Sequence, residues 1–124
     1  ASSVYLGGNV NSTNDNYILY LFATLAGVSK VGSYTGTGAD LNVDCGFSAG
    51  ARFVLIKRTD STGDWYYWNS IVAGNDPYLL LNSTAAQVTN TDYIDPLSSG
   101  FTVTSSASST VNVSSGNYIF LAIA

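Results

Sequence analysis

Residues 52–70 read RFVLIKRTDSTGDWYYWNS and contain two apolar runs on either side of one short polar loop. Both runs are rich in the β-branched and aromatic residues that fit the pleated surface of a sheet. The loop, residues 59–64, has a glycine near its end, which is typical of a β-hairpin. We therefore expect residues 52–58 to form a central strand and residues 65–70 to form its antiparallel partner, with aromatic side chains in contact across the pair.

Further strand-like segments, separated by turn residues, lie on both sides of this hairpin. Tyr17 to Ala23 is apolar throughout, which predicts a strand buried on both faces. Turns follow one another about every ten residues, which is typical of a sandwich. The sequence therefore predicts an all-β fold, an antiparallel β-sandwich of jelly-roll-like type. Its other strands are expected at 28–34, 42–47, 78–81, 100–104, 111–113 and 118–123.

The length of 124 residues predicts one domain with its own core. Residues 1–16 are expected to form an N-terminal arm or linker that becomes ordered against a neighbour, because they are mostly polar. Residues 17–124 are expected to form the single β-sandwich domain. We expect its core to be built from Ile18, Leu19, Leu21, Phe53, Leu55, Trp65, Leu79, Phe101, Val103, Ile119 and Leu121.

The composition argues against most classes of chemistry. The chain has no His and no Glu, so the commonest general base and the usual carboxylate pairs are missing. We expect no enzyme activity, no catalytic residue and no cofactor. The single cysteine, Cys45, can form neither an internal disulfide nor a thiolate zinc site. We expect it to be a buried, unreactive thiol, and an intermolecular disulfide is the alternative.

The charge pattern limits the partners. A net charge of -4 with only four cations argues against a surface that follows phosphates, so no nucleic-acid partner is expected. No run of about 18 apolar residues is present, so no membrane partner is expected. Ser, Thr and Asn make up 40 of 124 residues, and such neutral polarity favours a protein of the cell exterior or of a virion. The chain contains no Met, which predicts a processed product or part of a longer polypeptide.

Several acidic and amide side chains lie close together in sequence. Hard cations prefer such oxygen ligands, although turns stabilised by Asx side chains explain the same pattern. None of the pairs has the dense alternation of a calcium-binding loop, so no metal site is predicted. The pairs are Asp40 with Asp44, Asn75 with Asp76, and Asp92 with Asp95.

Four consecutive aromatic residues, Trp65, Tyr66, Tyr67 and Trp68, are the candidate binding residues. Adjacent residues of a strand face opposite sides, so Trp65 and Tyr67 share one face while Tyr66 and Trp68 share the other. One face should belong to the core. The other is then either a contact between subunits, which we favour, or a stacking surface for sugar rings.

The two ends of the chain resemble each other. Val10-Asn11 followed by Asn16-Tyr17-Ile18 recurs, 101 positions later, as Val111-Asn112 followed by Asn117-Tyr118-Ile119. The match is either a chance result of low sequence diversity or the use of one hairpin type at both ends. In the second case the two similar strands could pair with each other, or one could be replaced by the strand of a neighbouring subunit, which would give polymerisation by strand addition.

A series of short strings stands in a fixed order in the sequence: 30–38, 45–47, 53–58, 63–65, 78–79 with Asn82 and 85–86, 99–101, 111–112 and 118–119. In that order they resemble a module common in structural proteins of tailed bacteriophages, especially marine ones. That module occurs in tail or adsorption proteins and in other virion proteins, and the resemblance covers roughly residues 10–124. The sequence lacks the charged tail and the arginine after the hairpin that the module commonly carries.

The resemblance and the composition together predict a non-enzymatic structural component of a phage virion that acts through homo-oligomeric assembly. It would belong to the tail or adsorption apparatus, such as a tail fiber, or to a capsid decoration, and its partners would be copies of itself and other virion proteins. The alternative is a carbohydrate-binding module that recognises host-surface glycans. A second alternative is a subunit of an extracellular filament or surface layer.

Overall fold

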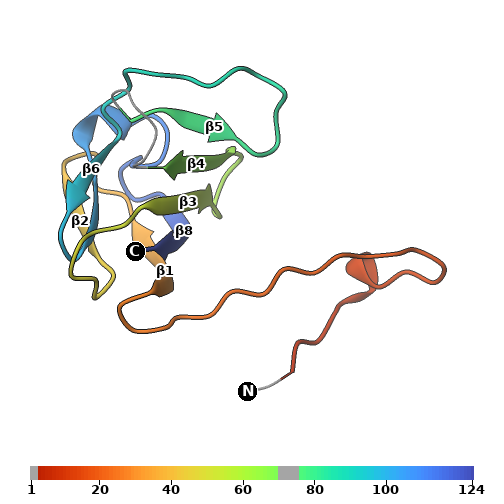
Figure 1. Ribbon diagram of the computed structural model, residues 1–124. Coiled ribbons are helices and arrows are strands. Elements are labelled where there is room, and N and C mark those ends of the chain that lie inside the picture. The colour runs from red at the N-terminus through yellow and green to blue at the C-terminus, as the bar shows by residue number, and fades with distance from the viewer. Residues whose placement is uncertain (1–2, 70–75) are drawn as a thin grey trace.

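The computed structural model describes residues 3–69 and 76–124 and places the predicted hairpin at the centre of a sheet (Figure 1). Residue 70, the last of the predicted hairpin, lies outside the described residues. Strand β3 spans Phe53–Arg58 and strand β4 spans Trp65–Asn69. They pair antiparallel, with Leu55 opposite Tyr67, so the predicted hairpin is confirmed.

The described residues form two antiparallel sheets that pack face to face, which confirms the predicted all-β sandwich. The five-stranded sheet has the order β1-β8-β3-β4-β5, and the three-stranded sheet has the order β2-β7-β6. β1 pairs with β8 while β2 pairs with β7, so the chain passes between the sheets at both ends, as a jelly-roll-like wrap does. The remaining strands are β1 Ser29–Thr35, β2 Leu41–Asp44, β5 Tyr78–Leu80, β6 Ile94–Leu97, β7 Gly100–Val103 and β8 Asn117–Ile123.

The core lies between the two sheets. From the five-stranded sheet it takes Val54, Ile56, Trp68, Tyr118 and Phe120, and from the three-stranded sheet it takes Val43, Ile94, Phe101 and Val103. No helix of the described residues is long and apolar enough to cross a membrane. The only helical elements described are two short 3-10 turns, Gly8–Val10 and Ser105–Ala107.

The prediction of a buried strand over Tyr17 to Ala23 is wrong. These residues are extended but belong to no strand, and all seven are exposed. They lie in an arm that runs away from the sandwich (Figure 1). The sandwich itself begins with β1 at Ser29. An apolar run shows that a segment can be buried, but it does not say which surface will cover it.

The predicted core is only partly correct. Phe101, Val103 and Leu121 are buried, and Phe53 and Leu55 are half-buried. Six other members are exposed, so their assignment to the core is wrong: Ile18, Leu19, Leu21, Trp65, Leu79 and Ile119. The last three lie on the outer face of the five-stranded sheet. Both faces of that sheet are apolar, so alternation along each strand could not show which face points inward.

Two details of the loops also differ from the prediction. Ile94–Leu97 forms β6 although it contains Pro96, because β6 is an edge strand, where a proline is tolerated. Residues 111–113 form no strand. Asn112 is instead fully buried. Its side-chain amide bonds to backbone groups of Thr37, Ala39 and Thr104.

Candidate interaction surface

The four aromatic residues of β4 divide between the two faces of the sheet, as their alternation predicts. Trp68 is 4% exposed and packs in the core, whereas Trp65 is 39% exposed on the outer face. The ring of Tyr66 stacks on that of Trp68, with centroids 5.6 Å apart. Tyr67 lies on the outer face, where its ring contacts that of Phe53 at 5.1 Å. Only Trp65 and Tyr67 are therefore placed to meet a partner.

The outer face of the five-stranded sheet is an apolar surface that continues across every strand. One row of side chains runs through all five strands, because their residues are directly opposite one another: Val31, Leu121, Leu55, Tyr67 and Leu79. Parallel rows on either side add Ile119 with Trp65 and Ile123 with Phe53. We refer to the surface formed by these nine residues as the outer face.

Both ends of the outer face are accessible to a partner, whereas Leu121 between them is only 7% exposed. Val31 and Ile119 are each 43% exposed, and Leu79 at the other end of the central row is 37% exposed. Lys57 is the one charged residue on the same side of these strands, and its ammonium group donates to the Gly63 carbonyl. Antiparallel sheets commonly bury one apolar face and leave a polar face in water. This sheet departs from that pattern, because the central row of its outer face is apolar as well as its inner face.

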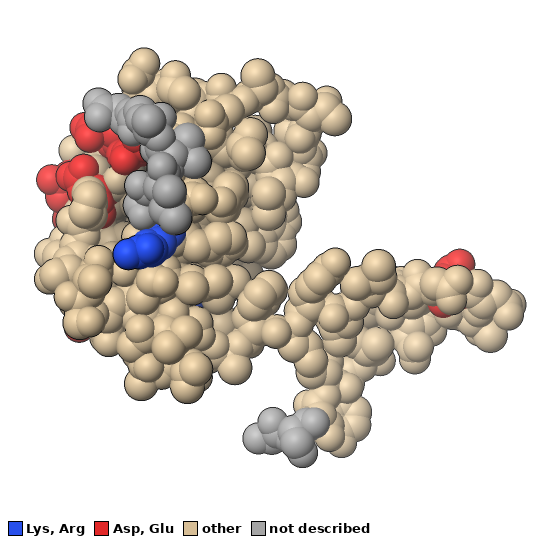
Figure 2. Space-filling view, in the orientation of Figure 1, with Lys and Arg blue, Asp and Glu red and all other residues tan. Residues whose placement is uncertain are grey.

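A second apolar surface lies in the arm. Ile18 is 82% exposed, and its neighbours from Tyr17 to Phe22 are all at least half exposed or close to it. Asp15 is the only charged residue in 3–28, which agrees with the nearly uniform colour of the arm in Figure 2. The arm therefore offers a continuous apolar strip with no partner among the described residues.

A groove of about 410 Å³ separates the edge strands β1 and β2, at one open side of the sandwich. Its apolar lining comes from both sheets, with Tyr34 and Phe120 from the five-stranded sheet and Leu41 and Val43 from the three-stranded sheet. Gly32 of β1 lies directly beneath the Phe120 ring, since a Cβ atom at this position would lie 2.8 Å from the ring. Lys30 and Asp44 give the groove one charge of each sign.

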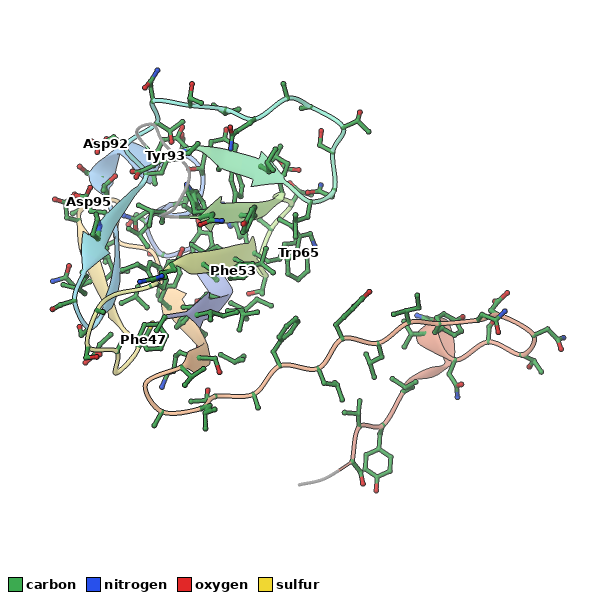
Figure 3. The ribbon with its side chains drawn as sticks, viewed as in Figure 1. Phe47, Phe53, Trp65, Asp92, Tyr93 and Asp95 are labelled. Atoms are coloured by element: carbon green, nitrogen blue, oxygen red, sulfur yellow. The ribbon has the colours of Figure 1, made fainter. Side chains whose placement is uncertain are left out.

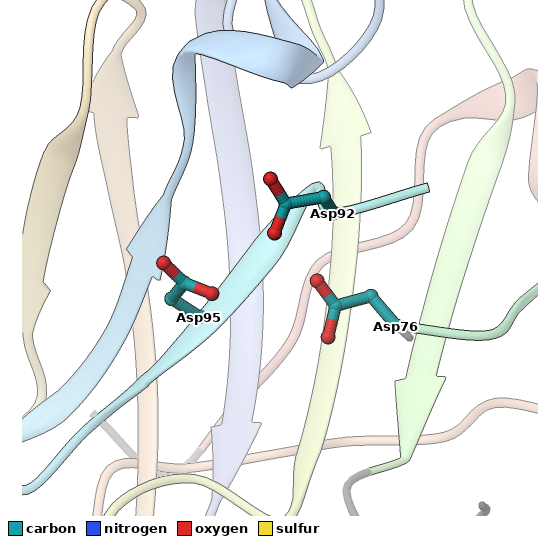
Figure 4. A group of neighbouring side chains, drawn as sticks. All are labelled: Asp76, Asp92 and Asp95. Carbon is teal, nitrogen blue, oxygen red and sulfur yellow. The ribbon is translucent and has the colours of Figure 1, made fainter. Parts of the chain in front are cut away.

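Three carboxylates converge at the opposite side of the sandwich (Figure 4). Oxygens of Asp76, Asp92 and Asp95 lie within 4.8 Å of one another. Burial raises the pKa of Asp76, and the neighbouring charges of Asp95 and Asp92 add to the increase. Figure 3 shows Asp92 and Asp95 far from Trp65, so this cluster is separate from the outer face. A shared proton or a bound hard cation would relieve the repulsion.

The cluster combines members of two pairs that the sequence analysis had singled out separately. Asp92 and Asp95 are brought together, and Asp76 joins them, while Asn75 lies outside the described residues. The third pair, Asp40 with Asp44, has structural roles instead. Asp44 accepts a hydrogen bond from the Gly46 amide at 2.8 Å, as in an Asx turn, and Asp40 accepts one from the Ser105 amide.

A cavity of about 220 Å³ lies beside the carboxylates and between the sheets. Trp68 and Val54 line it from one sheet, and Ile94 and Phe101 line it from the other. The indole Nε1 of Trp68 is buried and has no hydrogen-bond acceptor among the described residues. Asp76 and Asp95 also line the cavity, together with Arg52 and Asn69, so its lining combines apolar side chains with charges of both signs.

Cys45 lies in the core at 6% exposure, which confirms the expectation of a buried thiol. Burial raises its pKa to about 11, so the thiol is protonated at neutral pH. A protonated thiol is a poor nucleophile and a poor metal ligand.

Comparison with known proteins places the chain in a family. The family model described as "Domain of unknown function (DUF7483)" matches residues 1–124. The chain belongs to the DUF7483 family. No curated protein and no solved structure matches it. The DUF7483 match includes the arm as well as the sandwich, so the arm is part of what defines the family.

Sequence reasoning found the aromatic residues of β4 but missed the extent of the outer face in this DUF7483 chain. Val31, Leu55, Leu79 and Leu121 come from four segments that only the sheet order aligns. A signal was present, because β3 and β8 are apolar at nearly every position rather than at alternate ones. Such runs indicate strands that are buried on both faces.

Proposed function

We propose that this protein is a non-enzymatic structural component that works by assembling with copies of itself through the outer face. The observation that carries the proposal is the apolar row that crosses all five strands, from Val31 to Leu79, with its ends exposed. Burying apolar side chains is the main source of affinity between protein surfaces, and aromatic residues contribute most to it. Trp65 and Tyr67 are the aromatic anchors of this surface.

The outer face is built from the side chains of one sheet, and it is self-complementary in chemistry. Two such faces can pack as sheets do within a sandwich, about 10 Å apart. A two-fold arrangement would place the same residues on both sides of the contact. Lys57 lies between Ile119 and Trp65 in one of the two flanking rows and outside the central row, so it is the central rows of two copies that can pack without a cation between them.

The test is the sedimentation behaviour of charge-inserting variants. We expect Leu79→Lys and Val31→Lys to weaken self-association by at least tenfold, because each places a cation in an apolar contact. Ser109→Lys is the matched control, since Ser109 is an exposed loop residue away from the outer face. Equal association of all three variants would exclude the outer face as the contact.

We propose that this assembly belongs to a virion, in the tail or adsorption apparatus or in a capsid decoration, and the resemblance to structural proteins of tailed bacteriophages supports this proposal. A protein that coats or extends a particle needs stable surfaces rather than reactive groups, and the buried, protonated Cys45 fits that need. Antibodies against the chain, visualised by immunogold electron microscopy, are expected to label one defined part of purified phage particles, such as the tail or the capsid surface. Labelling only of host-cell material would contradict the assignment.

A carbohydrate-binding module is the second candidate, and the exposed ring of Trp65 is the observation that favours it. Indole rings stack on sugar faces, and a homo-oligomer would add multivalency. A glycan array probed with Trp65→Ala separates the candidates: loss of glycan signal in a variant that still assembles would favour this function. Trp68→Ala is unsuitable for the comparison, because Trp68 is buried in the core.

A further inference from the structure

One edge of the five-stranded sheet is open. β1 pairs with β8 on one side, and on the other side Ser29 exchanges backbone hydrogen bonds of 2.9 Å with Leu25. Outward-pointing backbone groups alternate along a strand, so those of Val31, Ser33 and Thr35 point the same way. The Thr24 hydroxyl bonds to the Val31 amide and carbonyl, at 3.1 and 3.3 Å. No described residue pairs with the outward backbone groups of Ser33 and Thr35, so this edge can accept a strand.

Residues 17–23 of the same chain do not use this edge, although Leu25 and Thr24 occupy its first part. The Thr24 hydroxyl is bonded to the outward backbone groups of Val31, so the backbone-to-backbone pairing along β1 ends at Ser29. The Ser29 hydroxyl donates to the Ala23 carbonyl at 2.8 Å and so fixes the direction in which the arm leaves the sheet. From this point the arm leads away from the sandwich (Figure 1). Each copy therefore carries an apolar strip without a sheet and a sheet edge without a strand.

The strip matches the surfaces on both sides of that edge. In an extended strand, Ile18, Tyr20 and Phe22 face one way, while Tyr17, Leu19 and Leu21 face the other. A strand added to β1 turns one set toward the groove lined by Tyr34, Leu41, Val43 and Phe120, and the other toward the outer face beside Val31. Both surfaces are apolar, and so are both sets.

The existing neighbour of β1 shows the type of strand that it accepts. β8, Asn117–Ile123, pairs with β1 along its whole length. The arm repeats its pattern, since Asn16-Tyr17-Ile18 corresponds to Asn117-Tyr118-Ile119. The arm run has seven residues and extends over about 23 Å, so part of it can pair with the free end of β1 at Ser33 and Thr35. An added arm would place strands of one sequence pattern on both sides of β1.

The size of the outer face indicates why such a strand is needed. Five strands about 4.8 Å apart, with rows over about five residues, give a face of roughly 400 Å². A standard protein interface buries roughly 800 Å² on each partner, so the outer face alone is small. A seven-residue strand that adds backbone hydrogen bonds and fills a groove enlarges the same continuous contact.

We propose that residues 17–23 of one copy bind as an added strand along the β1 edge of a second copy and fill the groove between β1 and β2. The inference rests on the proposed function, because it names the partner and the element through which copies join. The chemistry on the acceptor is a free strand edge beside an apolar groove. On the donor it is an apolar, uncharged strand. A sandwich that donates one arm and accepts another can form a closed ring or a filament.

Disulfide trapping between two distinguishable full-length chains tests the contact. Cys45 is first replaced by Ala, or by Val if the Ala variant does not fold. The cysteine-free chain should show the same sedimentation profile as the unmodified chain. The acceptor carries Ser33→Cys, and the donor, of different tag mass, carries one cysteine at each position from 17 to 23 in turn. We expect mixed disulfides at alternating donor positions only, because successive side chains of a strand face opposite sides.

A second measurement uses charge in the arm. Tyr20→Lys with Phe22→Lys in the full chain should weaken association by at least about tenfold, since the burial of two large aromatic side chains is lost. Tyr5→Lys is the matched control, because Tyr5 is an exposed aromatic of the arm outside the run. The control should associate as the unmodified chain does.

The outcomes separate this inference from the proposed function. A chain that assembles without mixed disulfides, and whose arm variant assembles normally, overturns the added strand and leaves the outer face standing. A disulfide that forms within one chain when residues 21 and 33 are both cysteine assigns the arm to its own edge and also overturns the inference. A chain that never associates overturns both.

Discussion

At the scale of single residues, Asn112 joins the loops at one end of the sandwich. Its amide nitrogen donates to the carbonyls of Ala39 at 2.8 Å, Thr104 at 2.9 Å and Val103 at 3.3 Å, and its side-chain oxygen accepts from the Thr37 amide at 2.9 Å. The residue is fully buried. The amide therefore replaces the water that these backbone groups would otherwise require.

Replacing Asn112 with Ala should lower the free energy of unfolding by about 3 kcal/mol or more, because several buried backbone groups lose their partner. Urea denaturation followed by tryptophan fluorescence measures the change. Asn11→Ala is the matched control, since Asn11 holds the corresponding position of the repeated pattern but is exposed. It should change stability by less than about 0.5 kcal/mol. Equal small effects at both positions would show that the Asn112 network is not stabilising.

The carboxylate cluster should make stability depend on pH. The folded pKa of Asp76 is raised by burial and by Asp95 and Asp92. A group with a raised folded pKa contributes fully to stability below its unfolded pKa, and this contribution is lost as the pH rises through the folded pKa. We therefore expect Asp76→Asn to melt at a higher temperature than the unmodified chain at pH 7.

The advantage of Asp76→Asn should shrink as the pH falls toward about 4, the ordinary range of an aspartate, because the native carboxyl then takes up a proton. Thermal unfolding between pH 3.5 and 7 by circular dichroism would show the two melting curves converging, with about half a pH unit between points. A melting difference that stays constant over this range would mean that the carboxylates do not repel one another.

Sequence alone located some of these residues and could not locate others. Asp92 and Asp95 are three positions apart, so their proximity could be expected, but Asp76 reaches them only through the packing of the chain around β5 and β6. The role of Asn112 was also hidden. Its four partners come from the β1–β2 connection and from the end of β7, and no local pattern marks an amide that joins them.

At the scale of elements, β4 divides its aromatic residues between core and surface. Trp68→Ala should cost about 3–5 kcal/mol of unfolding free energy, because it leaves a cavity beside Phe101 and Ile94. Trp65→Ala should cost less than about 1.5 kcal/mol in a dilute, unassociated sample, since this ring is partly in water. The same variant should weaken association, so denaturation and sedimentation would rank the two variants in opposite order.

A Trp65→Ala variant that loses as much stability as Trp68→Ala would contradict the assignment of faces. The matched pair is informative because both residues belong to one strand, three positions apart, and differ mainly in the face they occupy. Fluorescence of the remaining tryptophan in each variant gives a second reading, since a buried indole emits at shorter wavelength than an exposed one.

The residue patterns of the strands predict the fold class but not the orientation of each strand. The strands β3, β4, β7 and β8 follow from apolar runs between turn residues, and β1 follows from a more polar strand-like segment. The sheet class follows from these strands. Which face of each strand points into the core could not be predicted from these runs. Leu55 and Ile56 are equally apolar neighbours on β3, and only the position of the second sheet determines which of them is buried. The run from Tyr17 to Phe22 was assigned to the core for the same reason: its composition requires a cover, and the single chain does not provide one.

At the scale of the whole molecule, assembly should depend on apolar contact rather than on charge. Lys57 is the only charged residue on the outer side of β3, β4 and β8 in the described chain, and the arm run carries no charge. Salt screens charge interactions, with a Debye length of about 3 Å at 1 M, but does not weaken apolar burial. We therefore expect association to persist from low salt to about 1 M NaCl, as measured by light scattering. Dissociation at high salt would indicate an ionic interface instead.

The family extends across the arm and the sandwich together, and both carry unpartnered apolar surfaces. Two such surfaces in one chain have a common explanation if copies of the chain cover one another. The outer face then supplies the flat contact, and the arm supplies the strand that crosses from one copy to the next. The sandwich core, with Cys45 inside it, serves to hold these surfaces in place.

The central claim is that the chain associates with itself, and sedimentation velocity of the unmodified full chain tests it most directly. Over about a hundredfold range of concentration around the micromolar level, mass action should shift a self-associating protein between species. We predict a weight-average sedimentation coefficient that rises with concentration above that of a single chain, or stays above it throughout. A single species with the mass of one chain at every concentration would contradict the account.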